Sequence, residues 1–301
     1  MFDIFLAGGK NTEIDNYICE HNYPRLFSQL NDWSGIKDYV DKLRSGNTKS
    51  KLFIDSGAFT AKTQGVSVDI NEYIRKINTI SDSIYCFANL DVIPNSKNHS
   101  DLRISAEAGY DNFIHIVENC KCPEKCVAVY HADDPEDTFY RYVEYYKENA
   151  KLRYFALGGV VGGSAENVFS FLHKYSAIFK RFLPNVKLHL LGFTKLSKLK
   201  FINADSSDST TWIMVSATGC ILTDFGVLLV SDVQKNHPKN ALNIDKDARG
   251  VVEEYVGKYG FTLKQLSEDY KSRMMWNINY IQEFSKTIEY SGNVNIKKRL
   301  L

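Results

Sequence analysis

Short apolar runs alternate with amphipathic stretches along most of the chain. In the amphipathic stretches, such as residues 70–81, 137–150 and 166–183, apolar residues recur every three or four positions, which predicts helices. This alternation is typical of parallel α/β folds, and eight apolar runs predict a (β/α)8 barrel. The runs that predict strands are residues 2–9, 52–59, 85–92, 127–131, 154–161, 187–193, 200–206 and 220–226.

The pattern departs from a simple repeat near both ends of the chain. About forty residues separate the first two expected strands and hold at least one extra helix, whereas only a loop fits between the last two. Beyond them, residues 245–258 and 262–287 predict helices that close the barrel or lie on it. No repeat, low-complexity linker or shift in composition indicates a second domain. We therefore expect one domain over residues 1–301, with a barrel to about residue 230 and C-terminal helices over about 245–287.

Composition places the chain among globular, soluble proteins that can bury a full core, since 44% of its residues are hydrophobic and 24% are charged. Its 37 basic and 36 acidic residues nearly cancel, so a nucleic-acid partner would need a local basic patch. A cluster of cationic residues is dense enough to form such a patch, although a solvated helix face explains it equally well. The cluster consists of Lys180, Arg181, Lys187, Lys195, Lys198 and Lys200.

Neither a membrane span nor a secretion signal is expected. No apolar run approaches the roughly 18 residues that a span needs, and the N-terminal MFDIFLAGG carries an acid where a signal peptide carries a base. The six cysteines fall mostly inside apolar segments of a chain too long to need disulfides, which predicts free thiols in a reducing compartment. We expect a cytoplasmic protein with no membrane partner.

Polar residues stand where several of the predicted strands end. Active sites of barrel enzymes lie at the C-terminal ends of the strands, so these residues predict one polar pocket. Taken singly, an aspartate there can be the N-cap of the next helix, and a glycine can be a turn residue. The residues are Asp55, Asp91, His131, Gly158, Gly159, Gly192, Asp205 and Asp208.

Five segments around these residues resemble, in order, motifs of the tRNA-guanine transglycosylases and their relatives, which insert 7-deazaguanine bases into nucleic acid. The resemblance covers about residues 50–225 and supports the barrel fold. The segments are Asp55-Ser56-Gly57-Ala58-Phe59-Thr60, Leu90-Asp91-Val92-Ile93-Pro94, Val127-Ala128-Val129-Tyr130-His131, Gly158-Gly159-Val160-Val161-Gly162-Gly163-Ser164 and His189-Leu190-Leu191-Gly192.

The resemblance also chooses between two candidate nucleophiles. In the family, an aspartate precedes the nucleophilic aspartate by three positions, and a glycine follows the nucleophile by eleven. Asp205, Asp208 and Gly219 reproduce both intervals, which implies that Asp208 is the nucleophile.

Two departures from the family concern the segment after Asp208. Members acting on tRNA carry a zinc site there made of three cysteines and a histidine, whereas Cys220 is the only cysteine beyond Asp208 in this chain. Ser209-Thr210-Thr211-Trp212 replaces the family's Pro-Thr-Arg. A barrel without the zinc subdomain is more similar to the DNA-modifying branch of phages and bacterial modification islands. The implied activity is replacement of guanine in DNA by 7-cyano-7-deazaguanine, without a cofactor. The resemblance also implies accessory modification proteins as partners, and the host cytoplasm as the location if a phage encodes the protein.

The resemblance assigns a role to each site residue. Asp208 would attack C1′ of the sugar, and Asp55 would protonate the departing guanine and later deprotonate the incoming base. Asp91 would accept the guanine N1–H and amine protons, and Ser56 would bond the base. Gly158 and Gly159 would donate backbone amides to O6, and Leu191 would line the base site. His131 would contact O6 or the 7-substituent, or be satisfied by local hydrogen bonds. An extruded base could stack on nearby aromatic residues, although most aromatics fill cores; these are Tyr130, Phe193 and Trp212.

Other interpretations remain open on the sequence. A tRNA-guanine transglycosylase that has lost its zinc subdomain is the first alternative, and a non-catalytic barrel that binds nucleic acid is the second. A metal site for hydrolysis would need the carboxylates and His131, but no His-x-His or close acidic pair supports it. Cys120, Cys122 and Cys126 could bind a structural zinc with His99 or His115, at a spacing uncommon for zinc.

Overall fold

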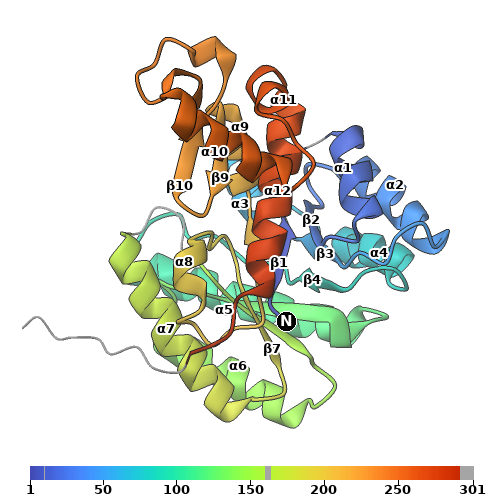
Figure 1. Cartoon of the computed structure of the whole chain (residues 1–301). Coiled ribbons are helices and arrows are strands. Elements are labelled where there is room, and N and C mark those ends of the chain that lie inside the picture. The colour runs from blue at the N-terminus through green and yellow to red at the C-terminus, as the bar shows by residue number, and fades with distance from the viewer. Residues whose placement is uncertain (10, 160–163, 292–301) are drawn as a thin grey trace, which may run out of the picture.

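A computed structural model describes residues 1–9, 11–159 and 164–291 and contains a closed eight-stranded parallel barrel surrounded by helices (Figure 1). Each strand pairs with the next along the chain, and the last pairs with the first, Phe5 lying opposite Asp208. This confirms the predicted (β/α)8 barrel. The strands are β1 (Asp3–Leu6), β2 (Arg25–Ser28), β3 (Leu52–Asp55), β4 (Cys86–Ala88), β5 (Cys126–His131), β6 (Tyr154–Gly158), β7 (Lys187–Leu190) and β8 (Ser206–Ser209).

The helices form where the sequence combines an apolar stripe with a capping residue. In the helix over Ile70–Ile80, for example, Tyr73 and Ile77 lie on the buried side, and the Asp69 side chain accepts from Glu72 N. The helices are α1 (Thr12–Glu20), α2 (Trp33–Arg44), α3 (Ala58–Gln64), α4 (Ile70–Ile80), α5 (His99–Asn119), α6 (Glu136–Glu148), α7 (Ala165–Phe182), α8 (Leu196–Leu199), α9 (Thr211–Ala217), α10 (Lys246–Gly257), α11 (Leu263–Glu268) and α12 (Tyr270–Lys286), with short 3₁₀ turns at Pro123–Lys125, Asp232–Gln234 and Ala241–Asn243.

The predicted strand count was right, but two of the eight strands were placed wrongly. Strand β2 lies in the segment where only an extra helix was expected, because its four residues begin with a charged Arg25. Residues 220–226, expected as the eighth strand, lie outside the barrel. There β9 (Cys220–Thr223) pairs antiparallel with β10 (Gly226–Leu229). The boundary of the barrel is therefore β8, not about residue 230.

Strand β8 also differs from the prediction for residues 200–206. The strand begins at Ser206, and its sequence, Ser-Ser-Asp-Ser, has no apolar residue. It is nevertheless mostly buried, because both of its neighbours in the barrel are strands, β7 and β1. Asp205 therefore comes immediately before a strand and Asp208 lies within the same strand, so the two aspartates occupy opposite ends of the barrel.

Side chains of the barrel interior form a core of their own. Phe5, Phe53, Val129 and Ala156 point inward and are almost fully buried. Successive side chains of a strand alternate between its two faces, so residues two positions further along point inward again at the C-terminal end. Those positions include Asp55 after Phe53 and His131 after Val129, which explains how separate strands deliver polar groups to one place.

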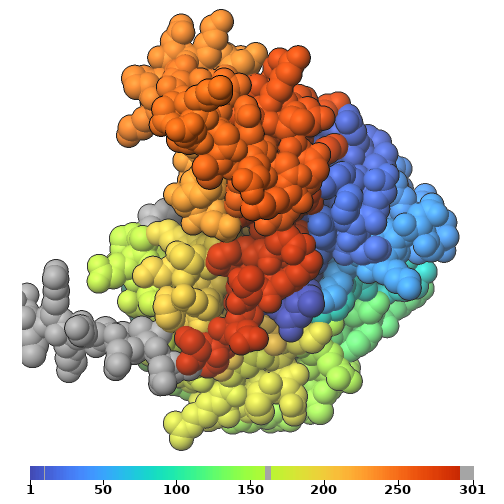
Figure 2. Space-filling model, in the orientation of Figure 1, coloured from blue at the N-terminus to red at the C-terminus, as the bar shows by residue number. Residues whose placement is uncertain are grey.

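Residues 220–268, together with Trp276 of α12, form a smaller lobe with a separate hydrophobic cluster. The helix expected over 262–287 is divided at Asp269, whose carboxylate caps α12 by accepting from Lys271 N and Ser272 N. In Figure 2 the lobe projects from one side of the barrel. Helix α12 joins the two parts, since Gln282 Nε2 donates to the Ile4 carbonyl in β1 at 2.8 Å. No helix in the described part of the chain is long and apolar enough to cross a membrane.

Candidate active site

A pocket of about 570 Å³ opens at the C-terminal ends of the barrel strands. Its volume lies in the usual range for small-molecule sites. It is lined by residues from seven strands or the loops that follow them, from Leu26 to Asp208. All eight residues proposed as catalytic or substrate-binding from the sequence lie in its wall, and these are Asp55, Ser56, Asp91, His131, Gly158, Gly159, Leu191 and Asp208.

Asp55 is the last residue of β3 and carries a strongly perturbed carboxyl group. Burial raises its pKa to about 7, and the negative charges of Asp91 and Asp208 add to this effect. The Gly57 N–H donates to Asp55 Oδ2 at 3.0 Å, and this hydrogen bond offsets part of the rise in pKa. Gly57 has φ 78°, and a Cβ there would lie 2.8 Å from Leu30 Cβ, so this turn needs glycine. A carboxyl group with a pKa near neutrality can both give and accept a proton.

Asp91 follows β4 and has a hydrogen-bond donor on each carboxylate oxygen. Ser56 Oγ donates to Oδ1 at 2.8 Å, and His131 Nε2 lies 3.0 Å from Oδ2. Each carboxylate oxygen has two lone pairs, so the group keeps the capacity to accept from a ligand in the pocket.

His131 ends β5, and both of its ring nitrogens face carboxylates. Nδ1 lies 3.6 Å from Asp134 Oδ2, which also accepts from the His131 backbone N–H at 2.8 Å. Burial alone would lower the pKa of His131, but hydrogen bonds and charges of Asp134 and Asp91 outweigh it and raise the pKa to about 10. Of the two roles left open by the sequence, the geometry favours local hydrogen bonding over contact with a base.

Asp208 lies inside β8 and is held by groups from β7 and the turn after it. Its Oδ1 accepts from Gly192 N at 2.7 Å and lies 3.2 Å from His189 Nε2. His189 Nδ1 in turn lies 2.9 Å from Ser206 Oγ. Sequence analysis did not assign a role to His189, although it begins one of the segments that resemble the family. The sequence did contain a signal for His189: side chains alternate between inward and outward positions along β7, and this histidine occupies an inward one.

Asp205 does not belong to the pocket. Its Oδ2 lies 2.5 Å from Lys180 Nζ and accepts from Leu188 N at 2.7 Å, so the side chain ties the end of α7 to the beginning of β7. The expectation that Asp205 stands at the end of a strand was therefore wrong. Only Asp208 of this pair can face a ligand in the pocket.

The two glycines that end β6 pack against His131. A Cβ on Gly158 would lie 3.1 Å from His131 Cδ2, and one on Gly159 would lie 2.9 Å from His131 Cβ. Gly159 also has φ 71°. Their lack of side chains therefore makes room for the histidine as well as for a ligand. Residues 160–163, which complete this family-like segment, lie outside the described residues.

The aromatic residues expected to stack on a base are not available for it. Tyr130, Phe193 and Trp212 are buried, and Trp212 donates its indole N–H to the Ala7 carbonyl at 3.0 Å. Phe59 lines the pocket instead, with 60% of its surface exposed. It belongs to the segment Asp55–Thr60, where the sequence analysis gave weight only to the polar residues.

Ser28 was not predicted as a site residue, because the strand that carries it, β2, was not predicted from the sequence. It lines the pocket, and its Oγ is one of two buried side-chain polar atoms without a hydrogen-bond partner in the described part of the chain. A buried hydroxyl without a partner costs free energy unless a ligand or water satisfies it. Ser28 therefore adds a candidate ligand contact on the wall next to Asp55.

The cationic cluster noted in the sequence does not surround this pocket. Lys180 is paired with Asp205, and Lys187, at the start of β7, donates to the Tyr85 hydroxyl at 2.7 Å. Both lie towards the N-terminal ends of the strands, and none of the six cluster residues lines the pocket. The cluster therefore does not form a basic patch around the site.

Cysteines 120 and 122 lie close together, with their sulfur atoms 3.6 Å apart. Across the residues that the structure describes, no group of three or more His, Cys, Asp or Glu side chains is arranged to hold a metal ion. This applies to the cysteine segment and to the acidic pocket alike.

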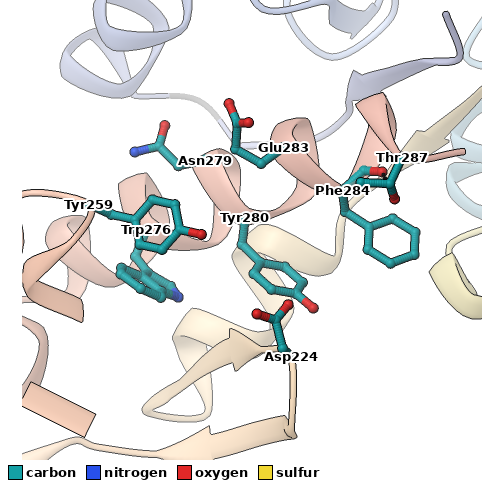
Figure 3. Close-up of a pocket in the computed structure, with 8 residues that line it drawn as sticks. All are labelled: Asp224, Tyr259, Trp276, Asn279, Tyr280, Glu283, Phe284 and Thr287. Carbon is teal, nitrogen blue, oxygen red and sulfur yellow. Dashed lines mark hydrogen bonds between the residues drawn. The ribbon is translucent and has the colours of Figure 1, made fainter. Parts of the chain in front are cut away.

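A second cavity, of about 390 Å³, lies between α12 and the turn after β9 (Figure 3). Aromatic side chains of Tyr259, Trp276 and Tyr280 form much of its wall, with Asp224 at its edge. Tyr280 donates its hydroxyl to the Thr223 carbonyl at 3.1 Å. None of the residues singled out in the sequence lines it, so the pocket at the strand ends is the candidate active site.

The fold and the site define a (β/α)8 barrel with an acidic pocket at the C-terminal ends of its strands. No protein-family model matches the chain, and no curated protein matches it. Inference about its activity therefore depends on the pocket itself.

Proposed function

We propose that the protein is a base-exchange transglycosylase that replaces guanine in DNA by a 7-deazaguanine, 7-cyano-7-deazaguanine being the implied base. The observation that carries the proposal is the meeting of Asp55, Asp91 and Asp208 in one pocket, where Asp55 has a pKa of about 7. Base exchange needs a nucleophilic carboxylate, a carboxyl group that shuttles a proton, and an acceptor for the base. The three aspartates match these needs in kind and in placement.

The reaction would proceed in two displacements at C1′ of the sugar. In the first, Asp208 forms an ester bond to C1′ as the glycosidic bond breaks, and guanine leaves with the proton of Asp55. In the second, the incoming 7-deazaguanine gives its N9 proton to Asp55 and attacks C1′, which releases Asp208. The Gly192 amide and His189 hold the attacking carboxylate. The two displacements balance without a redox or nucleotide cofactor, and we propose none.

Recognition of the base would use complementary groups in the wall of the pocket. Guanine presents N1–H and its exocyclic amine next to the acceptor O6, so the Asp91 carboxylate suits the donors and the backbone amides of Gly158 and Gly159 suit O6. Leu191 and Phe59 supply apolar surface for the faces of the ring. Ser56 is occupied with Asp91, so we propose that it orients the carboxylate.

The nucleic acid would have to present an unstacked nucleotide, because the reacting groups lie inside the pocket and cannot reach C1′ within a stacked duplex. DNA is the proposed polymer and tRNA the alternative. We propose that accessory modification proteins contribute contacts to the phosphate backbone, since none of the six residues of the cationic cluster lines the pocket.

The test is incorporation of 7-cyano-7-deazaguanine into duplex DNA, single-stranded DNA and unmodified tRNA, followed by nucleoside mass spectrometry. We expect incorporation into DNA by the wild type and none by Asp208→Ala. The matched control is Asp205→Asn, which alters the aspartate three positions earlier at the other end of the barrel and leaves exchange per folded molecule unchanged. A covalent protein–DNA adduct should also form with the wild type and not with Asp208→Ala.

The same assay separates the alternatives. Incorporation only into tRNA would assign the protein to the tRNA-guanine transglycosylases. Absence of exchange on every substrate, with retained binding of nucleic acid, would support a non-catalytic barrel. A metal-dependent hydrolase would be supported instead by hydrolytic activity that is lost with a chelator and regained with a divalent ion.

A further inference from the structure

His131 connects two carboxylates that come from different loops of the barrel. Asp91 follows β4 and contacts Nε2 at 3.0 Å, and Asp134 follows β5 and lies 3.6 Å from Nδ1. The three side chains are nearly buried, with exposed fractions of 12% for Asp91, 13% for His131 and 6% for Asp134. Asp134 is also fixed by the His131 backbone N–H at 2.8 Å. The arrangement is therefore built into the pocket wall.

We propose that His131 and Asp134 are positioning residues that hold Asp91 as an oriented acceptor, and that His131 does not itself contact the base. This rests on the proposed function, because it concerns how the same pocket selects its base. Both oxygens of Asp91 are held from the protein side, by Ser56 and by His131. Their remaining lone pairs are therefore fixed in direction and suit a ligand with two adjacent N–H donors.

Packing prevents the histidine from moving to another role. Gly158 and Gly159 lie against the ring on the β6 side, with Cβ positions that would fall 3.1 Å from His131 Cδ2 and 2.9 Å from His131 Cβ. A rotation of the ring towards a ligand would break its contacts with both carboxylates and leave Asp134 buried without its ring partner. A buried charge that loses its partner costs several kcal/mol.

Charges around His131 favour its protonated form. Asp91 and Asp134 face its ring from the loops after β4 and β5, and Asp55 of β3 interacts electrostatically with Asp91. On the β6 side, Gly158 and Gly159 lie against the ring and carry no charged group. The pKa of His131 is raised to about 10, so the ring stays an imidazolium across neutral pH, with Nε2 close to Asp91 and Nδ1 facing Asp134.

The consequence is selectivity for the amine-bearing edge of the base. Guanine and 7-deazaguanine present N1–H and the exocyclic amine to Asp91, whereas hypoxanthine lacks the amine. An Asp91 carboxylate that is free to rotate would lose part of this distinction. Asp134, which touches neither edge directly in this scheme, would therefore influence discrimination between the two bases.

The test measures binding of free guanine and free hypoxanthine to the intact protein by calorimetry. Asp134→Asn should weaken guanine binding by about 10- to 100-fold, as loss of an outer hydrogen-bond partner does in other polar sites, and should change hypoxanthine binding less. Its matched control is Asp137→Asn, because Asp137 is a nearby aspartate that does not line the pocket and pairs with Arg103 at the surface. The control should bind both bases as the wild type does.

A double-mutant cycle and a spectroscopic readout keep the proposal falsifiable if Asp134→Asn lowers stability in general. A glutamine at 131 can donate to Asp91 but does not need Asp134, so His131→Gln combined with Asp134→Asn should bind guanine as His131→Gln alone does. In ¹⁵N NMR spectra at pH 8, both ring nitrogens of His131 should be protonated in the wild type. Asp134→Asn should lower the fraction of molecules in that doubly protonated state.

The outcomes are separable from those of the base-exchange assay. Guanine binding that is selective in the wild type and loses its selectivity in Asp134→Asn supports the positioning role even if no exchange occurs, in which case only the proposed function fails. The positioning role would be overturned by any one of three results: equal guanine binding by the wild type and Asp134→Asn, additive effects in the double-mutant cycle, or a neutral His131 ring at pH 8. A wild type that binds neither base would overturn both proposals.

Discussion

At the scale of single residues, the environment of each aspartate matters more than its identity. Asp55, Asp91, Asp205 and Asp208 are the same side chain, yet one has its pKa raised to about 7, one is held by a serine and a histidine, and one ties a helix to a strand. Asp208 accepts from a backbone amide and faces His189. The chemistry open to each carboxylate follows from these contacts.

The raised pKa of Asp55 predicts how stability depends on pH. The folded protein keeps this proton up to about pH 7, whereas the unfolded chain loses it near 3.8, so this group lowers the free energy of unfolding as the pH rises between these values. Asp55→Asn cannot ionise and should stabilise the protein above pH 7. Each pKa unit is worth about 1.4 kcal/mol, which sets an upper limit of about 4 kcal/mol.

Thermal unfolding at pH 4.5 and pH 8.5 checks this prediction, with Asp38→Asn, at an exposed position of α2, as the matched control. The melting temperature of Asp55→Asn relative to the wild type should rise between the two pH values, and that of the control should not. The same difference at both pH values for Asp55→Asn would contradict the raised pKa. The variant should also be inactive in base exchange, because it cannot transfer the proton.

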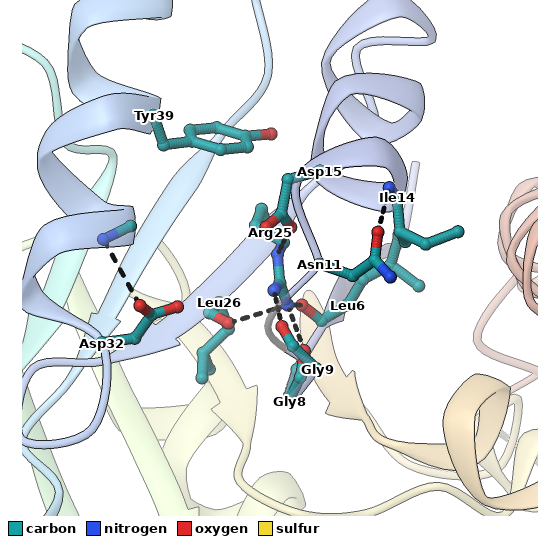
Figure 4. Close-up of polar contacts among 12 residues, drawn as sticks. Leu6, Gly8, Gly9, Asn11, Ile14, Asp15, Arg25, Leu26, Asp32 and Tyr39 are labelled. Atoms are coloured by element: carbon teal, nitrogen blue, oxygen red, sulfur yellow. Dashed lines mark hydrogen bonds and ion pairs between the residues drawn. The ribbon is translucent and has the colours of Figure 1, made fainter. Parts of the chain in front are cut away.

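At the scale of elements, strands with an apolar pattern were predicted from the sequence and those with polar residues were not. β1, β3, β4, β6 and β7 lie within their predicted ranges, and β5 begins one residue before its range, because their apolar side chains face the core. Strand β2 begins with Arg25, whose guanidinium lies among backbone carbonyls at the end of β1 (Figure 4). The contacts that make a charged residue compatible with a buried strand lie on other segments of the chain.

Arg25 should be one of the most sensitive residues outside the pocket. It donates to the carbonyls of Leu6, Gly8 and Gly9 at 2.6–2.7 Å and pairs with Asp15 at 3.0 Å. Arg25→Lys keeps the charge but not the planar set of donors, so buried carbonyls lose their partners. We expect a loss of about 2–4 kcal/mol in the free energy of unfolding.

Urea unfolding of Arg25→Lys measures this loss. Arg44→Lys makes the same substitution at an exposed ion pair with Asp82, where solvent screens the charges and the expected loss is much smaller than for Arg25→Lys. Equal losses for the two variants would show that the contacts of Arg25 do not stabilise the β1–α1 connection.

At the scale of the whole molecule, the closed barrel brings residues from distant parts of the sequence into one pocket. Asp55 and Asp208 are more than 150 positions apart in the chain, yet both line the same pocket because β3 and β8 belong to one closed barrel. The lobe formed by residues 220–268 has its own core and is joined to the barrel by α12. Because the pocket opens at the strand ends, the proposed function requires a target nucleotide to leave its base stack to enter.

This geometry predicts a preference among DNA substrates. Extrusion of a paired base costs a few kcal/mol, and the cost is least for a mismatched or unpaired base. Guanine in single-stranded DNA or opposite a mismatch should therefore be exchanged faster than guanine in a paired duplex, by about 10-fold or more. Initial rates on oligonucleotides of one sequence, differing only in the opposing strand, check this. Faster exchange in the perfect duplex would contradict it and indicate recognition of paired DNA.

The sequence by itself determined the fold class and eight residues of the pocket, because alternating apolar runs and polar strand ends are local patterns that a barrel converts directly into a core and a site. It did not determine the positions of strands β2 and β8. It also did not show that Asp205 and the expected stacking aromatics stand apart from the pocket, or which contacts His189, Ser28 and Asp134 make. These depend on which groups meet across the barrel, such as His131 between Asp91 and Asp134. Hydrogen bonding and burial act through space, and only the tertiary structure brings the partners together.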